Sequence, residues 1–279
     1  MFEDKTISFI GSGVMGEAMI RGLLGQKNVL PTQILAADPW GQRREELQDR
    51  YGISVTEDNR EAAENGQIIV LSIKPQTLPY VLPEIRGHLR HQDLLLSILA
   101  GVPIKKLADG TAHAAVVRAM PNTPAQIGQG ITVWTATPEV TEVQKQQAQA
   151  ILASLGQEIR VDEEDYLDMA TALSGSGPGY VFMMMEALID AGVHLGFSRR
   201  IAEQLVFQTM LGSVEYAMQS GKHVAELRNQ VTSPGGTTAA ALYHMEKGGL
   251  RTVISRGIWA AYQRSVSLGK GKAEDDPES

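Results

Sequence analysis

The sequence contains no cysteine and no long apolar segment. Without cysteine among its 279 residues, disulfide bonds, thiolate metal sites and cysteine nucleophiles are excluded. No run approaches the roughly 20 apolar residues that a membrane-spanning helix needs. The opening stretch MFEDKTISFIGSG lacks the pattern of a signal peptide. These absences predict a cytoplasmic protein that does not engage a membrane.

Clustered positive charge and metal-ligand spacing are also missing. The chain has 25 Lys and Arg against 32 Asp and Glu, a net charge of -7. Nucleic-acid binding needs a clustered basic face, so we expect no such partner. The six histidines show no close spacing such as H-x-x-x-H, and we therefore expect no metal site.

The stretch FIGSGVMG, residues 9–16, carries the pattern G-x-G-x-x-G between an expected strand, residues 6–10, and an expected helix, residues 17–24. In that setting the first glycine permits a tight turn, the second lets backbone approach a pyrophosphate, and the third brings the helix close to the strand. A glycine turn without a ligand is the alternative. We predict dinucleotide binding by Ile10, Gly11, Ser12, Gly13, Val14, Met15 and Gly16.

Asp38 gives a second, conflicting signal about the dinucleotide. An acidic residue at the end of the second strand commonly binds the ribose 2′-OH of NAD and repels a 2′-phosphate. Arg43 and Arg44 follow a few residues later and are suited to accept that phosphate. The sequence leaves the choice between NADH and NADPH open.

Strands and helices alternate through the first half of the chain. The expected strand at residues 68–73 is nearly all apolar, as a parallel strand buried on both faces should be. Such a series predicts an α/β doubly wound sheet that binds its ligand at the carboxyl ends of the strands, in a domain covering residues 1–162. The other strands are expected at residues 6–10, 34–37, 53–55, 94–99, 115–119, 130–134 and 157–161.

From residue 163 the pattern becomes helical. Residues 180–195 and 201–216 are apolar on most sides, which in a small domain indicates burial against a second subunit. We expect a helical domain over residues 163–269. Residues 270–279, KGKAEDDPES, lack apolar residues and are predicted to be disordered.

Two loops of the second half are rich in glycine and hydroxyl residues. For residues 174–180, SGSGPGY, close helix packing and a ligand role are equally favoured. Residues 231–238, VTSPGGTT, precede an alanine-rich helix, with hydroxyl residues expected to cap it. A helix start of this kind is an anion site, and we favour a small carboxylate ligand over a plain N-cap.

Several ordered motifs make the chain resemble Δ1-pyrroline-5-carboxylate reductases, from Ile7 to about Gly269. The motifs are IGSGVMG at 10–16, SIKPQ at 72–76, SILAGV at 97–102, RAMPNTPA at 118–125, LSGSGPGYVF at 173–182 and VTSPGGTTAAAL at 231–242. The last two of these are the most specific of the set.

The resemblance implies a Rossmann-type nucleotide-binding domain followed by an all-α dimerisation domain, in a homodimer that often joins a larger ring of dimers. Glu164 matches a position near the ligands in relatives. Asp38 stands where relatives favouring NADPH carry Ser, Thr or Asn. The further residues that line the cofactor in the family correspond to Asn59, Ser72, Ile73, Lys74, Pro75, Ala100, Gly101 and Asn122.

The implied reaction is hydride transfer from NADPH or NADH to L-1-pyrroline-5-carboxylate, giving L-proline, the last step of proline biosynthesis. The substrate carboxylate would be held by the loop after residue 232, in which Thr238 hydrogen-bonds the ring nitrogen or relays a proton. Ser233 and Thr238 are the candidate catalytic residues, and the candidate substrate-binding residues are Ser233, Gly235, Gly236, Thr237, Thr238 and Glu164.

Two other functions stay open at this point. One is another imine or β-hydroxyacid reductase of the same architecture. A β-hydroxyacid enzyme would need a lysine in the first long helix of the second domain, and residues 166–195 contain none. The other is a non-catalytic dinucleotide sensor, which has no need for a hydroxyl-rich anion loop.

Overall fold

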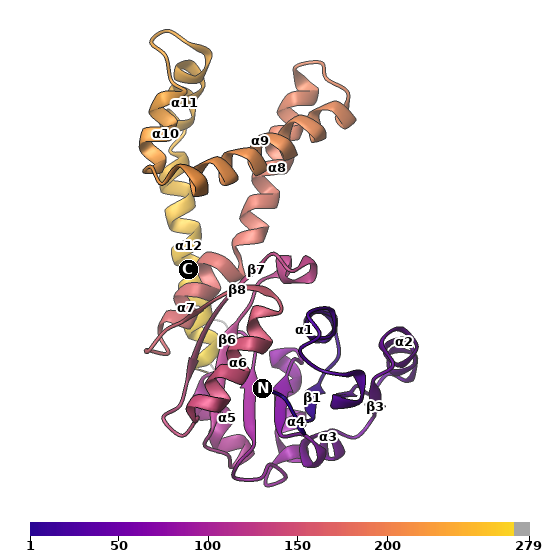
Figure 1. Ribbon diagram of the computed structural model, residues 1–279. Helices are drawn as coiled ribbons and strands as arrows, with labels where there is room; N and C mark the ends of the chain where they lie inside the picture. Colours follow the sequence, from indigo (N-terminus) through magenta and orange to yellow (C-terminus); the bar gives the residue numbers. More distant parts are fainter. Residues whose placement is uncertain (271–279) are drawn as a thin grey trace. The chain divides into compact units, whose positions relative to one another are not determined.

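An eight-stranded sheet forms the centre of the amino-terminal part of the chain (Figure 1). The computed structural model describes residues 1–270, so the predicted disordered tail lies outside the described residues except for Lys270. All eight predicted strands are confirmed, with ends that shift by up to two residues. They are β1 Ile7–Ile10, β2 Ile34–Ala37, β3 Ser54–Thr56, β4 Ile68–Leu71, β5 Leu94–Ser97, β6 Val116–Met120, β7 Gly130–Ala136 and β8 Gly156–Arg160.

The strand order is β3-β2-β1-β4-β5-β6-β7-β8. Strands β1 to β6 are all parallel, which confirms the doubly wound arrangement. β7 runs antiparallel to β6 and parallel to β8, so the last two strands point the other way. The order reverses between β1 and β4, and ligands bind this fold at such a switch point.

Helices cover both faces of the sheet, because successive strand residues point to opposite sides. Ile7 and Phe9 of β1 join one apolar core and Ile10 joins the other. Helices α1 (Val14–Gly25), α2 (Gly41–Tyr51) and α6 (Glu142–Ala153) pack on the first face, and α3 (Asn59–Asn65), α4 (Leu78–Ile85) and α5 (Ile104–Thr111) pack on the second.

Packing divides the described chain into two units, Met1–Ser176 with the residues from Ala261 onward, and Gly177–Ala260. This division differs from the predicted domain boundary at 162/163. Helix α7 (Tyr166–Ala170) stays with the sheet because Arg118 of β6 binds Asp168. The end of α12 (Leu250–Gly269) does so too, since the Ser265 hydroxyl donates to Asp168 Oδ1 at 2.7 Å.

The second unit consists of α8 (Gly177–His194), α9 (Arg199–Ser220), α10 (Val224–Gln230), α11 (Thr237–Lys247) and the start of α12. Helices α8 and α9 approach closely at Gly192, where an added Cβ would lie 3.0 Å from Ala202 Cβ. Ser198 begins α9 by accepting the Ile201 N–H at 3.4 Å.

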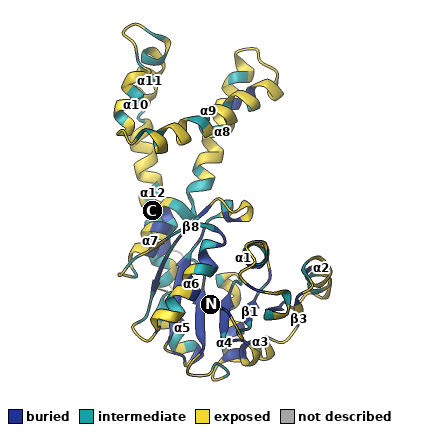
Figure 2. Cartoon of the chain, in the orientation of Figure 1, coloured by how far each residue is buried: buried dark blue, intermediate teal, exposed yellow. Residues whose placement is uncertain are grey.

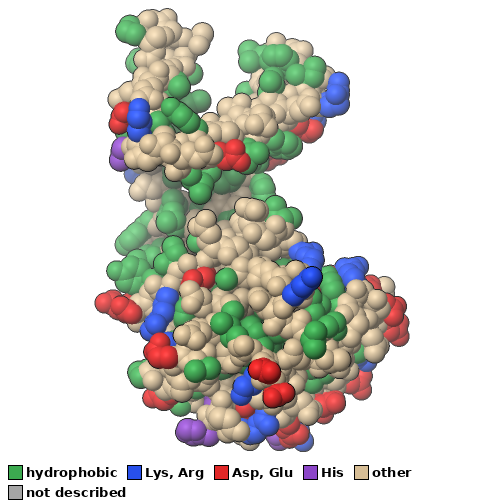
Figure 3. All heavy atoms as spheres, in the orientation of Figure 1, with side chains coloured by type: hydrophobic (Ala, Val, Ile, Leu, Met, Phe, Trp, Pro, Cys, Tyr) green, Lys and Arg blue, Asp and Glu red, His purple; other side chains and the backbone are tan. Residues whose placement is uncertain are grey.

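The helices of the second unit leave much apolar surface uncovered, in contrast to the buried strands of the sheet (Figure 2). Phe207, Leu211, Val214 and Met218 of α9 follow one helix face, and each is more than half exposed. Hydrophobic side chains gather on the surface of these helices in Figure 3. Among the described residues, no helix combines the length and the apolar character required to span a bilayer.

Candidate cofactor and substrate site

The carboxyl ends of the six parallel strands carry the residues that the sequence predicts for the cofactor. The glycine loop follows β1, Asp38 follows β2 and Asn59 follows β3 shortly after its end. Residues 72–75 follow β4. Ala100 and Gly101 come after β5, and Asn122 after β6. Because parallel strands end at the same edge of the sheet, one edge holds all of these positions.

The glycine loop fits tightly against the neighbouring strand end. Gly11 has a φ of +87°, and an added Cβ would lie 2.6 Å from Ile73 Cγ2. The Ser72 hydroxyl donates to the Gly11 carbonyl at 2.5 Å. A Cβ on Gly16 would approach the same carbonyl to 2.7 Å. Glycine is therefore required at positions 11 and 16 by the protein itself.

Gly13 is different, because among the described residues no atom beyond the adjoining backbone lies within 4 Å of the Cβ that it lacks. It is the N-cap of α1, and no described side chain caps that helix. The first amide groups of a helix have no partner within the helix and attract anions. Open space beside the start of α1 fits a pyrophosphate, so the residues present suit a dinucleotide.

Asp38 is oriented toward the glycine loop rather than toward solvent. Its carboxylate belongs to a residue only 8% exposed. Oδ2 accepts the Ser12 N–H at 3.2 Å and the Ser12 hydroxyl at 2.8 Å, while Oδ1 accepts the Trp40 N–H at 3.1 Å. Asp38 therefore fixes the glycine loop and keeps a negative charge at the end of β2.

Arg43 and Arg44, which the sequence offers as acceptors of a 2′-phosphate, are both in ion pairs with glutamates. Arg43 donates from Nε and Nη2 to the Ser12 carbonyl at 2.9 and 2.7 Å, and Nη2 lies 2.5 Å from Glu17 Oε2. Arg44 donates to the Asp38 carbonyl at 2.7 Å and to Glu57 at 3.0 Å.

Glu17, in the first turn of α1, is a residue that the sequence reasoning missed. It also accepts hydrogen bonds from Arg50 at 2.6 Å and from the Tyr51 hydroxyl at 2.8 Å. Burial opposes its ionisation, but the hydrogen bonds from Arg43, Tyr51 and Arg50, together with the positive charge of Arg43, hold the pKa of Glu17 below its ordinary value. An acid at a helix start, with arginines on the next helix, was the available signal.

Other predicted cofactor residues have structural partners at the same edge. The Asn59 side chain donates to Glu84 at 2.7 Å, and Asn122 Oδ1 accepts the Ile131 N–H at 3.0 Å. Lys74 is exposed. Gly101 has a φ of +67°, and a Cβ there would lie 2.9 Å from Leu268 Cβ.

Glu164 is held by the sheet unit. Its Oε1 accepts the Ile104 N–H at 2.7 Å and an N–H of Arg118, also at 2.7 Å. Arg118 is 3% exposed and was not singled out in the sequence, although an arginine inside the apolar strand VVRAM is an unusual feature. The contacts of Glu164 make it a residue that positions the start of α5.

The glycine- and hydroxyl-rich loop at residues 231–238 leads into α11, as predicted, but its capping differs. The N-cap is Gly236, and within the described residues no side chain caps the helix. The expectation that hydroxyl residues cap it is wrong. Gly235 takes a φ of +70°, and Gly236 N–H donates to the Ser233 carbonyl at 3.0 Å. The turn thus leaves the first amides of α11 without a side-chain cap.

The loop at residues 174–180 begins in close packing. A Cβ on Gly175 would lie 2.5 Å from Met120 Cε, and the Ser174 hydroxyl donates to the Ala170 carbonyl at 2.9 Å. Thr171–Gly175 form a π-helical turn before α8. The packing interpretation is confirmed for Gly175.

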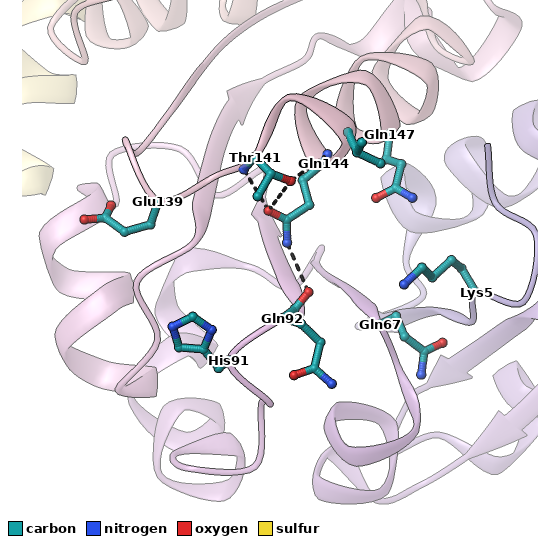
Figure 4. Close-up of a pocket in the computed structure, with 9 residues that line it drawn as sticks. Lys5, Gln67, His91, Gln92, Glu139, Thr141, Gln144 and Gln147 are labelled. Carbon is teal, nitrogen blue, oxygen red and sulfur yellow. Dashed lines mark hydrogen bonds between the residues drawn. The ribbon is translucent and has the colours of Figure 1, made fainter.

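A cavity of about 320 Å³ lies at the opposite edge of the sheet (Figure 4). Lys5, Gln67 and Gln92, which come before strands β1, β4 and β5, line it. The Gln144 side-chain amide donates a hydrogen bond to the Gln92 carbonyl at 3.1 Å. This cavity is therefore separate from the cofactor residues. In residues 1–270, no group of three or more acidic or histidine side chains is arranged to hold a metal ion.

Two protein-family models match the chain. The model described as pyrroline-5-carboxylate reductase dimerisation matches residues 164–268. The model described as NADP oxidoreductase, coenzyme F420-dependent, matches residues 6–101, which contain the glycine loop. The first match starts within two residues of the predicted domain boundary, and the helices it covers are those with uncovered apolar faces.

Individual relatives match over nearly the whole chain. Pyrroline-5-carboxylate reductase of Synechocystis is 42% identical over 95% of this chain and 98% of its own. That of Pseudomonas aeruginosa is 40% identical over 94% and 96%. A crystal structure of Plasmodium falciparum pyrroline carboxylate reductase with NADP bound has a TM-score of 0.88, with 32% identity over 96% of this chain and 100% of that one.

Proposed function

The chain belongs to the pyrroline-5-carboxylate reductase family, and we propose that it reduces L-1-pyrroline-5-carboxylate to L-proline with NAD(P)H. The observation that carries this conclusion is the similarity over nearly the full length, which includes both the glycine loop and the start of α11. A sensor that only binds a dinucleotide would not need the second of these features.

The reduced nicotinamide supplies the hydride, and the chain supplies binding and orientation. We assign the pyrophosphate to the loop from Ile10 to Gly16 and the first amides of α1. Asp38 serves the ribose. The strand ends at Ser72 to Pro75, Ala100 to Gly101 and Asn122, together with Asn59, line the rest of the cofactor. Their common place at one sheet edge supports this assignment.

We assign the substrate carboxylate to the loop from Ser233 to Thr238. The uncapped first amides of α11 and the hydroxyls of Ser233, Thr237 and Thr238 are donors of the kind that a carboxylate needs. Gly235 and Gly236 let the backbone turn without a side chain in the way. Glu164 supports the site indirectly by holding Arg118 and the start of α5.

The proton requirement of the reaction is modest. The imine carbon accepts hydride far better once the ring nitrogen is protonated, and the substrate can arrive in that form. Residues 231–242 contain no histidine or lysine. We assign Thr238 to a hydrogen bond with the ring nitrogen and Ser233 to the carboxylate beside it. Orientation of this kind contributes about 7–11 kcal/mol to lowering a barrier.

The direct test follows NADH and NADPH oxidation separately by the absorbance of the reduced nicotinamide, with and without pyrroline-5-carboxylate. We expect oxidation only with the imine, and L-proline as the product. NAD(P)H oxidation without substrate would contradict the proposal. Reduction of NAD(P)⁺ by a β-hydroxyacid, together with no oxidation of NAD(P)H by the imine, would contradict it as well. Gly13→Val is the control that removes the cofactor site.

The matched dimerisation domain means that the chain associates with itself. We propose a homodimer that joins a larger ring of dimers, supported by the uncovered apolar faces of the second unit. Light scattering would give the number of 30.2 kDa chains in the assembly. The cytoplasmic location stays a prediction, which cell fractionation would test.

A further inference from the structure

The end of β2 carries more negative than positive charge. Three glutamates, Glu17, Glu46 and Glu57, pair with arginines there, while the Asp38 carboxylate accepts hydrogen bonds from Ser12 and the Trp40 N–H. The arginines are Arg43, Arg44 and Arg50, and since their ion pairs are with the glutamates, they do not neutralise the Asp38 carboxylate. In this fold the same place distinguishes a ribose 2′-OH from a 2′-phosphate.

We propose that this chain selects NADH over NADPH, and that Asp38 and Glu17 together set the selection. The proposal rests on the function proposed above and deepens it, because that function leaves the choice of cofactor open. Asp38 acts directly, as an acceptor for a hydroxyl and a repulsive charge for a phosphate. Glu17 acts indirectly, through its ion pair with Arg43.

Asp38 keeps the capacity to accept a hydroxyl. A carboxylate offers about four acceptor positions. Three donors occupy it, namely the Ser12 N–H, the Ser12 hydroxyl and the Trp40 N–H. Since Ser12 also anchors it within the glycine loop, the nearly buried Asp38 side chain does not swing away from a second anion. A 2′-phosphate would place further negative charge against it, which is unfavourable where water is largely excluded.

The nearby cations are committed to other partners. Arg43 bridges the Ser12 carbonyl and Glu17, and its side chain is 21% exposed. Arg44 bridges the Asp38 carbonyl and Glu57, with 20% of its side chain exposed. Either arginine would have to break an existing ion pair to bind a phosphate, so neither contributes its full charge.

Glu17 is the residue that holds Arg43 in this arrangement. Its side chain is 15% exposed and receives Arg43, Arg50 and the Tyr51 hydroxyl. The Arg43 ion pair is also supported by Glu46 at 3.3 Å, an exposed and weaker partner. Replacing the Glu17 carboxylate with an amide keeps an acceptor for Tyr51 and Arg50 and removes the charge that neutralises Arg43.

The test measures the Kd of NADH and of NADPH by fluorescence titration of the full chain without substrate. For the wild type we expect NADPH to bind at least about tenfold more weakly than NADH, the size of one charge-assisted hydrogen bond. In Glu17→Gln, the NADPH Kd should fall about tenfold, while the NADH Kd stays within about twofold. In Asp38→Asn, NADH should weaken and NADPH should tighten.

Two controls separate charge placement from total charge. Glu3→Gln removes one negative charge from an exposed site and should leave the Kd ratio unchanged. Adding Arg43→Met to Glu17→Gln should cancel the gain in NADPH binding. If Glu17→Gln has a much lower Tm than the wild type, the ratio of the two Kd values in the wild type and in Asp38→Asn still decides the proposal.

Equal wild-type Kd values, or tighter NADPH, would overturn the selection. Equal shifts in Glu17→Gln and Glu3→Gln would overturn the role of Glu17. These titrations contain no imine, so they stand apart from the test of the reaction. A chain that prefers NADH but never reduces the imine refutes only the proposed function, and one that reduces the imine with equal cofactor affinities refutes only the selection.

Discussion

Arg118 on β6 and Glu164 before α7 form an ion pair of 2.7 Å in which the accepting oxygen, Oε1, also receives the Ile104 N–H. Arg118 reaches Asp168 as well, at 3.2 Å. One buried guanidinium thus connects the sheet to α7, and Glu164 connects both to the start of α5. The loop that carries Ala100 and Gly101 leads directly into that helix.

We predict that Arg118→Met lowers the free energy of unfolding by about 3 kcal/mol, because it leaves Glu164 and Asp168 without their cation in a largely buried place. Urea denaturation of the purified variant measures this. Arg251→Met is the matched control, since Arg251 of α12 pairs with Glu246 of α11 and both side chains are half exposed or more. Its loss should change the free energy of unfolding by about 0–1 kcal/mol. Equal effects would contradict the structural role of Arg118.

Glu164→Gln distinguishes positioning from direct contact with substrate. We expect a lower Tm and a modest fall in kcat, because the amide keeps a hydrogen-bond acceptor but loses the charge facing Arg118. Differential scanning calorimetry and steady-state kinetics measure the two effects. A rise in the KM for the imine at an unchanged Tm would instead assign Glu164 to the substrate.

Gly13→Val and Gly16→Val should fail for different reasons. The Gly13 side chain would enter open space, so we expect a folded protein with an unchanged Tm that has lost NAD(P)H binding. The Gly16 side chain would press on the Gly11 carbonyl, and we expect a loss of about 2 kcal/mol or more in stability. Thermal melts and nucleotide titration of both variants measure this, and normal cofactor affinity in Gly13→Val would refute the pyrophosphate assignment.

Thr238→Ala should lower kcat with pyrroline-5-carboxylate by about ten- to hundredfold, because one hydrogen bond to a charged group is lost. The Kd of NAD(P)H should not change, since the cofactor residues are untouched. Thr238→Ser should recover most of the activity. Thr252→Ala, which removes an exposed hydroxyl from α12, is the control. Full turnover in Thr238→Ala would remove this residue from the mechanism.

Stability should fall at mildly acidic pH through His113. Burial lowers the pKa of this side chain from its ordinary 6.5, because it disfavours the charged ring. Below that pH the unfolded chain takes up a proton that the folded chain refuses. The free energy of unfolding therefore falls as the pH drops below about 6.5, by at most about 1.4 kcal/mol per pH unit, until the folded pKa is reached.

His113→Asn removes this titration, together with the hydrogen bond between the ring and the Asp93 carbonyl. Urea denaturation at several pH values compares the two proteins. Over the interval of falling pH below about 6.5, the stability advantage of the wild type should narrow. A constant difference over that interval would exclude His113 as the source.

Leu211→Arg should disrupt self-association, because Leu211 lies in the middle of the exposed apolar face of α9. A buried, unpaired charge there would destabilise an interface by several kcal/mol. Light scattering should show a shift toward a single 30.2 kDa chain. Val143→Arg, an equally exposed apolar position on α6, should keep the assembly. Unchanged association in Leu211→Arg would place the interface elsewhere.

The strands were predictable because their signals are local. Four consecutive apolar residues in β4 indicate a strand buried on both faces, wherever it lies in the sheet. Helix α4 was not predicted, since Pro79 and Pro83 disguise a helix whose apolar face is covered by the sheet. The antiparallel direction of β7 was also not predicted, because a short connection after β6 sets it rather than the strand's own residues.

The sequence by itself determined the glycine loop, the succession of strands along the chain and the helix start at Thr237. Each of these depends on residues within a few positions of one another. Only the tertiary structure decided which charges remain available beside Asp38. Arg43 and Glu17 are 26 positions apart, and Arg50 and Glu17 are 33 apart. Coulomb attraction depends on distance in space. Only the folded chain therefore brings Glu17 to Arg43, which from the sequence alone was a candidate partner for a 2′-phosphate.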